Sequence, residues 1–431
     1  RGELSYIDSL LTAMDETNIL EKERKIDLIR WSIVSELSTF SYFDLDAVLA
    51  YLVKMNIVAR WALLDSKTGD EMFARLLAEL DGKICLGHVL YTTANGRSID
   101  NIEPLSFLHN TGSFAVAHNG NIVNATQIRE YLESKGSLFQ SNTNAELLAH
   151  LIKKEADEPR IFTIMEALDM LEGSFAFVIM TQNRLYACRD KHGIRPLASG
   201  KLGDGYVVSS ETCAFDVMGA EFVRDVEPGE IVVIDADGLH SFTYSHFKRH
   251  YMCAMEYVYF ARPDSDIEGC NVHAYRKESG RILYRESPVD ADIVIGVPDS
   301  SLSAAIGYAE ESGIPYEMGL IKNKYIGRTF IQPSQELREK GVRMKLSAVR
   351  SIVKGKRVVM IDDSIVRGTQ LRDNTRCLLE AGAKEVHMRI ACPPIMYGCP
   401  FTNFTTSKSD LELITRRFIA EFEGIDAAND P

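Results

Sequence analysis

The sequence predicts an α+β unit followed by an α/β unit, with a helical segment at the N-terminus. Residues 1–80 carry helically spaced apolar side chains. Short apolar runs separated by turn residues, with helices between some of them, fill residues 81–245 and indicate a layered unit with antiparallel strands. Buried strands alternate with helices from about residue 285, which indicates a parallel sheet with helices on both faces. We divide the chain into 1–80, 81–245, 246–400 and a C-terminal helix and tail, 401–431.

The elements of 81–245 follow from apolar runs that are bounded by Gly, Asn, Asp or Ser. The predicted strands are ICLGHVLY (84–91), FAVAHNG (114–120), SFAFVIM (174–180), RLYAC (184–188), YVVSS (206–210) and EIVVID (230–235). The predicted helices cover 125–135 and 144–155.

The elements after residue 285 alternate in type, and glycine ends each helix, at Gly313 and Gly382. The predicted strands cover 291–298, 315–321, 357–361 and 385–391. The predicted helices cover 303–312 and 369–381.

Composition and charge limit the class of protein. The chain has 431 residues, 45% of them hydrophobic and 25% charged, as ordinary globular domains do. A net charge of -13 argues against a protein that coats nucleic acid or is drawn to a membrane surface. No apolar run approaches the ~20 residues of a membrane span, and the start at Arg1 without a signal peptide predicts a cytoplasmic protein. The eight cysteines are scattered without CxxC pairs, so they predict neither a disulfide framework nor a zinc ribbon.

The stretch FAVAHNGNIVN (114–124) allows two interpretations. Asn119-Gly120 between apolar residues is typical of a tight hairpin turn. An Asn side chain beside a Gly N–H is also the kind of donor pair that stabilises an oxyanion. Because most such pairs are only turns, the residues alone favour the turn.

The most informative segment is VVMIDDSIVRGTQ (358–370). A buried strand ends in Asp362 and Asp363, and a loop with Gly368 leads into a helix. Ligands of open α/β sheets bind beyond the carboxyl ends of the strands, and the N–H groups at a helix N-terminus favour phosphate. The two acids suit ribose hydroxyls or a divalent cation that bridges to a pyrophosphate. The alternative is an acidic strand end that caps the next helix, with Thr369 as N-cap.

Two further features favour an anion site. GVPDSS (296–301) ends another strand of the same predicted sheet, so Asp299, Ser300 and Ser301 would reach the same crevice. Residues 322–345 hold seven Lys or Arg against two Glu, which suits a lid over pyrophosphate, although a solvated basic loop has the same composition.

Several long segments resemble the glutamine phosphoribosyl pyrophosphate (PRPP) amidotransferases, which catalyse the first committed step of purine biosynthesis. VVMIDDSIVRGT resembles the PRPP signature of phosphoribosyltransferases. Segments 196–220, 255–273 and 296–347 resemble this particular family, in its order, and the likeness runs from about 83 to 400. The resemblance implies a type I phosphoribosyltransferase sheet, preceded by an incomplete layered domain like that of the N-terminal-nucleophile glutaminases.

The resemblance also implies a transferase that makes phosphoribosylamine from PRPP with the help of Mg²⁺. By position, Asp362 and Asp363 would hold the ribose diol and the metal, and Ser301 would lie on the Mg²⁺ and pyrophosphate side. Gln370 stands where many members have a second Thr. The other PRPP-binding candidates are Ser364, Ile365, Val366, Arg367, Gly368 and Thr369 around the 5-phosphate, and Lys324, Arg328, Arg338 and Lys345 in the basic loop.

The glutaminase part departs from the family at its substrate contacts. Asn119 and Gly120 match the oxyanion pair, but Leu90 replaces the Arg that grips the glutamine carboxylate. Asn144 replaces the Asp that holds the α-amino group. The family's N-terminal nucleophilic Cys is absent, because the sequence opens with Arg and its first Cys is Cys85. We therefore expect the enzyme to use free ammonia and hardly any glutamine.

The expected cofactor is Mg²⁺. Cys253 and Cys399 match two of the four ligands of a [4Fe–4S] cluster in some members, and two thiolates do not hold such a cluster. The expected partners are PRPP with ammonia or glutamine, without nucleic acid or membrane, and the family implies a homo-oligomer. Two alternatives remain. One is a non-catalytic relative that senses PRPP or nucleotides and docks a partner through 1–80, and the other is a fused chain that does not fold as one unit.

Overall fold

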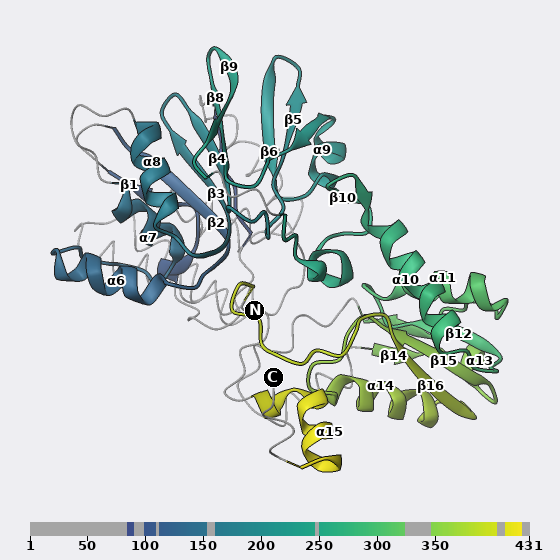
Figure 1. The fold of residues 1–431 in the computed structure, drawn as a ribbon. Coiled ribbons are helices and arrows are strands. Elements are labelled where there is room, and N and C mark those ends of the chain that lie inside the picture. Colours follow the sequence, from purple (N-terminus) through teal and green to yellow (C-terminus); the bar gives the residue numbers. More distant parts are fainter. Residues whose placement is uncertain are drawn as a thin grey trace, which may run out of the picture.

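The computed structural model describes two bodies joined by a short linking segment (Figure 1). The upper body contains β1 to β9, and the lower body contains α10 to α15 with β12 to β16. Expectations for residues 1–80, for Leu90 and for the basic loop with Lys324, Arg328, Arg338 and Lys345 lie outside the described residues. No helix of the described part is long and apolar enough to cross a membrane. The described residues are 84–89, 99–108, 112–152, 160–245, 250–323, 346–402 and 410–424.

The upper body is built on a six-stranded antiparallel sheet in the order β1-β2-β3-β4-β8-β9. Its long central strands are β2, whose first four residues are apolar and buried, and β3, which is apolar from Phe175 to Met180. The strands are β1 (Leu105–Phe107), β2 (Phe114–Ile122), β3 (Gly173–Thr181), β4 (Leu185–Arg189), β8 (Glu230–Asp235) and β9 (Gly238–Thr243).

Helices cover one face of this sheet, and a second sheet packs on the other. Apolar side chains of α6 (Ala125–Ser134), α7 (Asn144–Leu151) and α8 (Arg160–Asp169) form a core with those of β2, β3, β4 and β8. A smaller cluster on the opposite face lies toward the sheet β6-β5-β7. The predicted layering is therefore present. The remaining elements are η2 (Ile99–Asn101), β5 (Ala198–Leu202), β6 (Gly205–Ser209), α9 (Cys213–Met218) and β7 (Glu221–Asp225).

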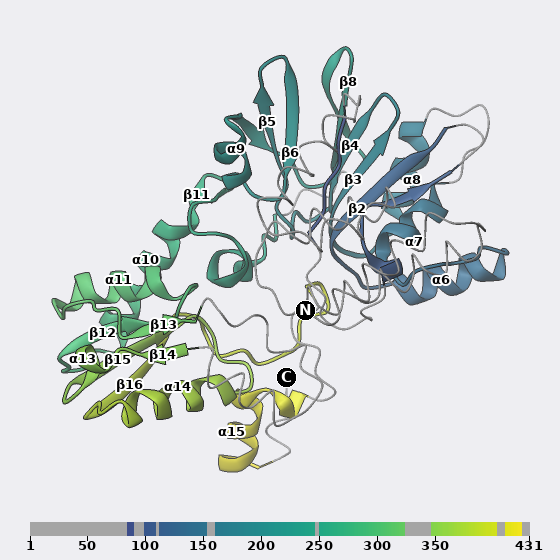
Figure 2. The ribbon, with the colours of Figure 1, turned by 180° about the vertical axis from the view of Figure 1, so that it is seen from behind.

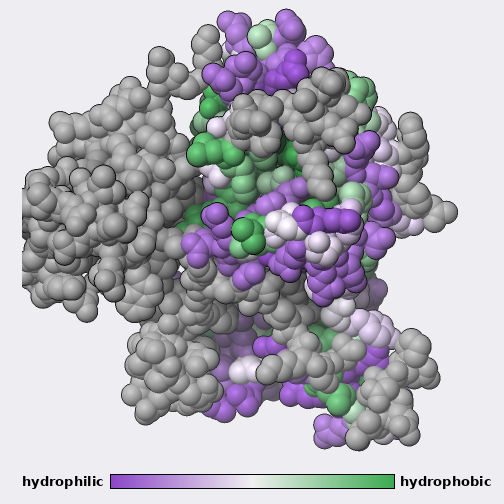
Figure 3. All heavy atoms as spheres, turned by 90° about the vertical axis from the view of Figure 1, so that its left-hand side faces the viewer, coloured by the Kyte–Doolittle hydropathy of each residue, from purple (hydrophilic) through white to green (hydrophobic). Residues whose placement is uncertain are grey.

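The upper body also leaves apolar side chains at its surface. Figure 3 shows hydrophobic residues in the upper half of one side of the molecule, bordered by hydrophilic ones. Exposed hydrophobic residues of this body include Leu108, Leu138 and Phe162. Scattered exposed apolar residues of this kind are normal for folded proteins.

The linking segment is η3 (Glu256–Phe260), followed by the small hairpin of β10 (Asp266–Ile267) and β11 (Cys270–Asn271). The buried ion pair Arg195–Glu256, with 2.7 Å between Nη1 and Oε1, ties this segment to the upper body. α10 (Val272–Glu286) then leads into the lower body (Figures 1 and 2).

The lower body has a parallel three-stranded sheet in the order β12-β15-β16 with helices on both faces, as predicted. α10 and α11 pack on one face, and α13, α14 and the β13–β14 hairpin pack on the other. α15 lies at the C-terminal end (Figure 1). The elements are β12 (Ile293–Gly296), α11 (Leu302–Ser312), β13 (Leu320–Lys322), β14 (Leu346–Ala348), α13 (Arg350–Val353), β15 (Arg357–Asp362), α14 (Thr369–Glu380), β16 (Glu385–Ile390), η5 (Asp410–Glu412) and α15 (Ile414–Phe422).

Three sequence predictions about strands and turns differ from the structure. The sequence predicts a strand over 84–91, but the described residues 84–89 form no strand, although their burial alternates between half-buried and exposed. The prediction of a hairpin turn at Asn119-Gly120 is also wrong, because both residues lie inside β2 and pair with Ala176 and Phe175 of β3. Pairing along the whole of β2 overrides the local turn preference of Asn-Gly. Of the predicted strand 315–321, only Leu320 and Ile321 lie in β13, and Tyr316 forms an isolated bridge with Val294.

Candidate functional site

The carboxyl end of β15 brings two carboxylates together with two serines of a neighbouring strand end. Asp362 and Asp363 are each 8% exposed, at the edge where β12 also ends. Ser301 Oγ donates to Asp362 Oδ1 at 3.1 Å, and Ser300 Oγ donates to Asp363 Oδ2. The hydroxyl of Ser364 donates to Asp363 Oδ1 at 2.7 Å. The structure therefore brings together the two strand ends that the sequence analysis placed in one crevice.

Burial sets the electrostatics of this pair. Desolvation and, to a smaller extent, the neighbouring charge of Asp363 raise the pKa of Asp362 to about 7, although hydrogen bonds to the carboxylate act in the opposite direction. Desolvation likewise raises the pKa of Asp363, while its bonds to Ser300 and Ser364 lower it. Two carboxylates that repel each other in a low-dielectric position gain most from a positive ligand. This end of the sheet is thus a place where a hard cation would be stabilised.

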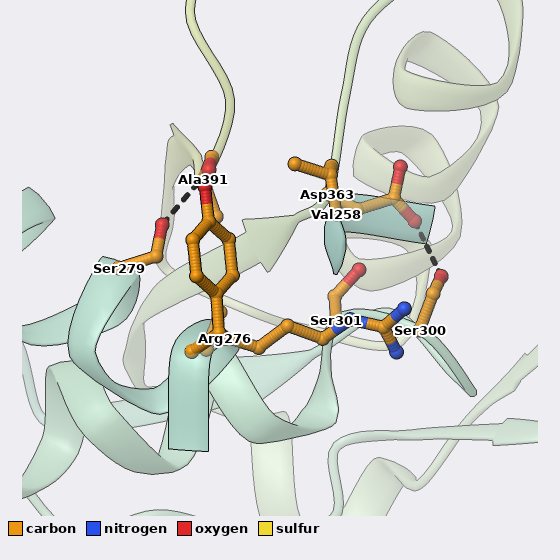
Figure 4. Close-up of a pocket in the computed structure, with 9 residues that line it drawn as sticks. Val258, Arg276, Ser279, Ser300, Ser301, Asp363 and Ala391 are labelled. Carbon is orange, nitrogen blue, oxygen red and sulfur yellow. Dashed lines mark hydrogen bonds between the residues drawn. The ribbon is translucent and has the colours of Figure 1, made fainter. Parts of the chain in front are cut away.

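Arg276 of α10 supplies a buried positive charge beside the pair. It is 4% exposed and donates to the carbonyl oxygens of Tyr257 and Ala261, at 2.6 and 2.8 Å. Figure 4 shows it reaching toward Ser300 and Ser301, in a small pocket that Asp363 also lines. Asp363 raises the pKa of Arg276, but desolvation is the larger effect and lowers it. Arg276 therefore connects the linking segment to the carboxylate pair.

The loop after the pair has the geometry of an anion site. Gly368 has φ 76°, in the left-handed region that glycine adopts readily, and it forms the N-cap of α14 without a side-chain bond. Thr369 is the first residue of the helix, so the interpretation of Thr369 as a side-chain N-cap is wrong. The first N–H groups of an α-helix have no partner within the helix. This helix N-terminus can therefore donate to a phosphate.

Other candidates lie near the second strand end. Lys322, the first residue of the predicted basic loop, donates to Asp299 Oδ2 at 2.8 Å. Ser301, at 0% exposure, is the N-cap position of α11. Ile365 is half-buried and packs against the core of the lower body. Arg367 pairs with Glu412 at 2.8 Å and so points to the C-terminal part of the chain.

The second candidate region is the middle of β2 in the upper body. Asn119 lies opposite Ala176, on the face of the sheet that is turned away from the helices. Gly120 has φ 138°, and a Cβ at this position would clash with the carbonyl oxygen of Ser174. Only glycine fits here, whatever chemistry the neighbouring Asn performs.

A buried polar cluster lies on the helix side of the same strand. The backbone N–H of His118 donates to Glu103 Oε2 at 2.5 Å, and His88 Nε2 lies 2.9 Å from the His118 carbonyl. Burial raises the pKa of Glu103 to about 8 and lowers that of His118 to about 3. Burial also lowers the pKa of His88 to about 4. These groups are therefore mostly uncharged at neutral pH.

Asn144 is the first residue of α7, directly after the N-cap Thr143, whose hydroxyl accepts from the N–H of Glu146 at 3.2 Å. It is half-buried and carries a neutral amide. A helix N-terminus is a favourable place for a carboxylate, so nothing in the local geometry requires an amide here.

Cys85, Cys253 and Cys399, the cysteines considered in the sequence analysis, differ in exposure. Cys85 and Cys399 are exposed, and Cys253 is half-buried. Burial raises the pKa of Cys253, which favours its thiol form over the thiolate that binds iron. Within the described residues, no group of three His, Cys, Asp or Glu side chains is arranged to hold a metal ion.

A parallel sheet with an acid pair and a phosphate-type loop at one edge, preceded by a layered body of sheets and helices, defines a two-part enzyme of the amidotransferase kind. Comparisons with known proteins agree. A family model described as "Glutamine amidotransferase domain" matches residues 96–217. The amidophosphoribosyltransferase of Bacillus subtilis (strain 168) is 55% identical over 336 residues, which are 78% of this chain and 71% of that protein. That of Staphylococcus aureus (strain MRSA252) is 52% identical, over 72% of this chain and 63% of that protein.

Solved structures give the same result. The structure of glutamine PRPP amidotransferase from B. subtilis, complexed with ADP and GMP, has a TM-score of 0.71 and 52% identity. The match covers 79% of this chain and 74% of that one. The chain therefore belongs to the amidophosphoribosyltransferase family, as its sequence resemblance predicted, and it is a transferase of purine biosynthesis.

The N-terminal segment matches a different family model from the rest of the chain. The relatives do not match residues 1–83, as expected from the sequence. A model described as "Protein of unknown function (DUF2764)" matches residues 2–84, a relation that the sequence analysis had not identified.

Sequence analysis missed Arg276 and the contacts of α15. A signal for Arg276 was present, because Val272, Arg276 and Gly280 recur at a spacing of four and all three are buried on α10. An arginine on the apolar stripe of a helix is a candidate for a buried functional charge. The contacts of α15 left no such signal, since they join residues about 50 positions apart in the chain.

Proposed function

We propose that this chain joins free ammonia to C1 of PRPP and releases pyrophosphate, with little use of glutamine. The observation that carries the proposal is the acid pair Asp362-Asp363, followed by a helix N-terminus that no side chain caps. In the reaction the ammonia nitrogen forms a bond to C1 while the bond from C1 to the pyrophosphate oxygen breaks, and the new ammonium loses a proton to solvent.

Each part of the lower body has a role in this step. The N–H groups between Ser364 and Thr369 would hold the 5-phosphate, and the acid pair would hold the ribose hydroxyls. The oxygen atoms of Asp362, Asp363 and Ser301 suit Mg²⁺, which usually takes one or two carboxylates and completes its shell with substrate phosphates and water. When bound, the ion neutralises the charge of the leaving pyrophosphate. The protein's own contribution is to position PRPP and to exclude water.

The upper body supports the dependence on ammonia. Glutamine is a zwitterion, and a neutral Asn144 cannot pair with its α-ammonium group as a carboxylate would. Two of the thiols in this body, Cys188 and Cys213, are buried, and burial raises the pKa of both, which is the opposite of an activated nucleophile. Residues 1–83 do not match the relatives. By resemblance Asn119 and Gly120 match an oxyanion pair, while Leu90 and Asn144 stand where the resemblance implies charged glutamine contacts.

The test is pyrophosphate release from PRPP and MgCl₂ with either ammonium chloride or glutamine as the nitrogen donor. We expect release that depends on ammonium and is near background with glutamine. The variant Asp363→Asn, which removes one charge of the acid pair, serves as the control for release by this site. Equal rates with both donors would overturn the ammonia-dependence, and ammonium-dependent release that persists in the control variant would overturn the assignment of the site.

A further inference from the structure

The C-terminal helix α15 contacts the backbone of residues 363–369, which we call the phosphate loop. The N–H of Ile414 donates to the carbonyl of Val366 at 2.8 Å. Arg417 Nη2 donates to the carbonyl of Arg367 at 2.6 Å. A Cβ at Gly368 would clash with Cδ1 of Ile414. Three consecutive residues of the loop are therefore in contact with the first turn of one helix.

The same helix turn also holds a second segment, residues 391–402, which we call the strap. Arg416 is 2% exposed, and its Nε donates to the carbonyl of Met396 at 2.8 Å. Its guanidinium carbon lies 4.1 Å from the centre of the Tyr397 ring. Buried guanidinium groups with fixed donors hold their partners in one orientation. Adjacent arginines of α15, Arg416 and Arg417, thus bind the strap and the phosphate loop.

The far end of the strap is attached to the upper body. Asn121 Nδ2 donates to the carbonyl of Pro400 at 2.6 Å, and Ser174 Oγ donates to the carbonyl of Phe401. Asn121 and Ser174 face each other across the β2–β3 ladder, one step beyond the pair Gly120–Phe175. Figures 1 and 2 both show the chain leaving β16 and running toward the upper body. The strap therefore ends beside the candidate oxyanion strand.

We propose that α15 and the strap are one positioning unit, through which the docking of the strap at Asn121 and Ser174 holds the phosphate loop in its PRPP-binding conformation. The proposal rests on the proposed function, because it assigns the loop 363–369 to PRPP. None of these residues touches the reacting atoms. Arg416, Arg417, Asn121 and Ser174 are positioning residues that act through the backbone of the loop.

The contacts predict a particular pattern of effects. A loop that holds the 5-phosphate equally in substrate and transition state contributes to binding and not to the chemical step. Loosening the strap should therefore weaken PRPP binding and raise KM, with kcat changed little. Coupling between two sites is reciprocal, so loosening the loop should also loosen the strap.

The experiment compares Asn121→Ala combined with Ser174→Ala against Asn124→Ala. Asn124 is the matched control, because its side chain bonds the backbone of Met170 and Glu172 within the upper body, both at 2.9 Å. Hydrogen–deuterium exchange of peptides that cover 363–369 is measured without substrate, and PRPP binding with MgCl₂ is measured by calorimetry. We expect exchange of the loop to rise about three- to tenfold in the double variant, and PRPP affinity to fall by a similar factor, as suits the loss of one or two hydrogen bonds. The control should match the unaltered chain in both.

In the double variant, hydrogen–deuterium exchange of the strap peptide 396–402 should become faster. If it does and exchange of the loop 363–369 stays at the rate of the unaltered chain, the proposal is overturned. If the double variant does not fold, Arg417→Met tests the coupling in the reverse direction, since it removes the donor to the loop and keeps the aliphatic stem. Faster exchange of the strap in Arg417→Met supports the unit, and unchanged exchange overturns it. The exchange readout needs no turnover. A chain that releases no pyrophosphate with ammonia would therefore refute the proposed function while the exchange data still decide this inference.

Discussion

The two bodies of this molecule differ in the kind of feature that the structure fixes at each candidate site. The lower body keeps charged and hydroxyl side chains in place, with Asp362 bonded to Ser301 and Asp363 bonded to Ser300 and Ser364. In the upper body the backbone is constrained, with Gly120 packed against Ser174, while Asn144, which the resemblance places at a glutamine contact, carries a neutral amide. A substitution that crowds the backbone of a core disrupts the fold, whereas a change of a half-buried polar side chain costs the fold little.

The bodies also differ in how they bury ionisable groups. In the lower body the acid pair lies beside the loop that we propose binds phosphate, where a cation and substrate would balance its charge. In the upper body Glu103, His88 and His118 are buried as largely uncharged groups that bond to backbone. The first arrangement suits binding, and the second suits the packing of β2. Four predictions test this contrast, from the largest expected effect to the smallest.

The largest effect is expected from Asp363→Ala in the lower body. It removes a carboxylate that accepts from the hydroxyls of Ser300 and Ser364 and lies near the charge of Arg276. Ammonia-dependent kcat/KM should therefore fall about 1,000-fold, the loss typical of a group that stabilises the transition state electrostatically. Pyrophosphate release at fixed PRPP and ammonium measures it. A fall of less than about tenfold would remove the acid pair from the centre of the site.

The second prediction concerns the backbone of the upper body. Gly120→Ala places a Cβ against the Ser174 carbonyl at a φ of 138°, so we expect a loss of about 3 kcal/mol or more in unfolding free energy. Urea denaturation followed by circular dichroism measures it. The matched control is Gly136→Ala, at a glycine with φ 89° but open space around the new Cβ, which should cost about 1 kcal/mol. Equal losses would show that crowding in β2 is not the constraint.

The third prediction is a pH dependence that arises from Glu103. Its pKa is raised from an ordinary 4.5 to about 8 in the folded chain, so the unfolded chain loses this proton first as pH rises. The stabilising contribution is therefore full below about pH 4.5 and is lost as pH rises through about 8. Glu103→Gln keeps the shape without the titration, so the variant should gain roughly 4 kcal/mol relative to the unaltered chain between pH 4.5 and pH 8.

Chemical denaturation at several pH values checks this third prediction. The histidines of the cluster have lowered pKa values, about 4 for His88 and about 3 for His118, and destabilise the fold only as the pH falls below the ordinary value of 6.5. Their contribution has the opposite slope and remains in the variant. Parallel stability curves for the two proteins would mean that Glu103 is ionised in the folded chain.

The smallest effect is expected from Asn144→Asp. A carboxylate in the first turn of α7 interacts favourably with the helix dipole, so the variant should be more stable by about 0.5 kcal/mol. It should gain no glutamine-dependent pyrophosphate release, because one restored charge does not supply a nucleophile. A clear gain of glutamine-dependent activity would show that the upper body needs only this contact to work.

Most residues of the candidate site in the lower body could be predicted from local sequence, because they are close in the chain. Asp362, Asp363 and Gly368 lie within one strand–loop–helix unit, and the strand end at Ser300 and Ser301 follows from parallel pairing. The pattern failed where distant segments decide the outcome. Asn119-Gly120 has the composition of a turn, yet pairing with β3 along all of β2 holds it in a strand. The contact of α15 with the phosphate loop joins residues about 50 positions apart in the chain, so no local pattern predicts it.

The central claim is that the transferase body works while the glutaminase-like body does not supply its ammonia. The most direct measurement is the release of pyrophosphate and of glutamate in one assay, with PRPP and MgCl₂, first with ammonium chloride and then with glutamine. The account predicts pyrophosphate with ammonium, and neither glutamate nor pyrophosphate above background with glutamine. Glutamate formed in equal amount to pyrophosphate, at a rate comparable to that with ammonium, would contradict it.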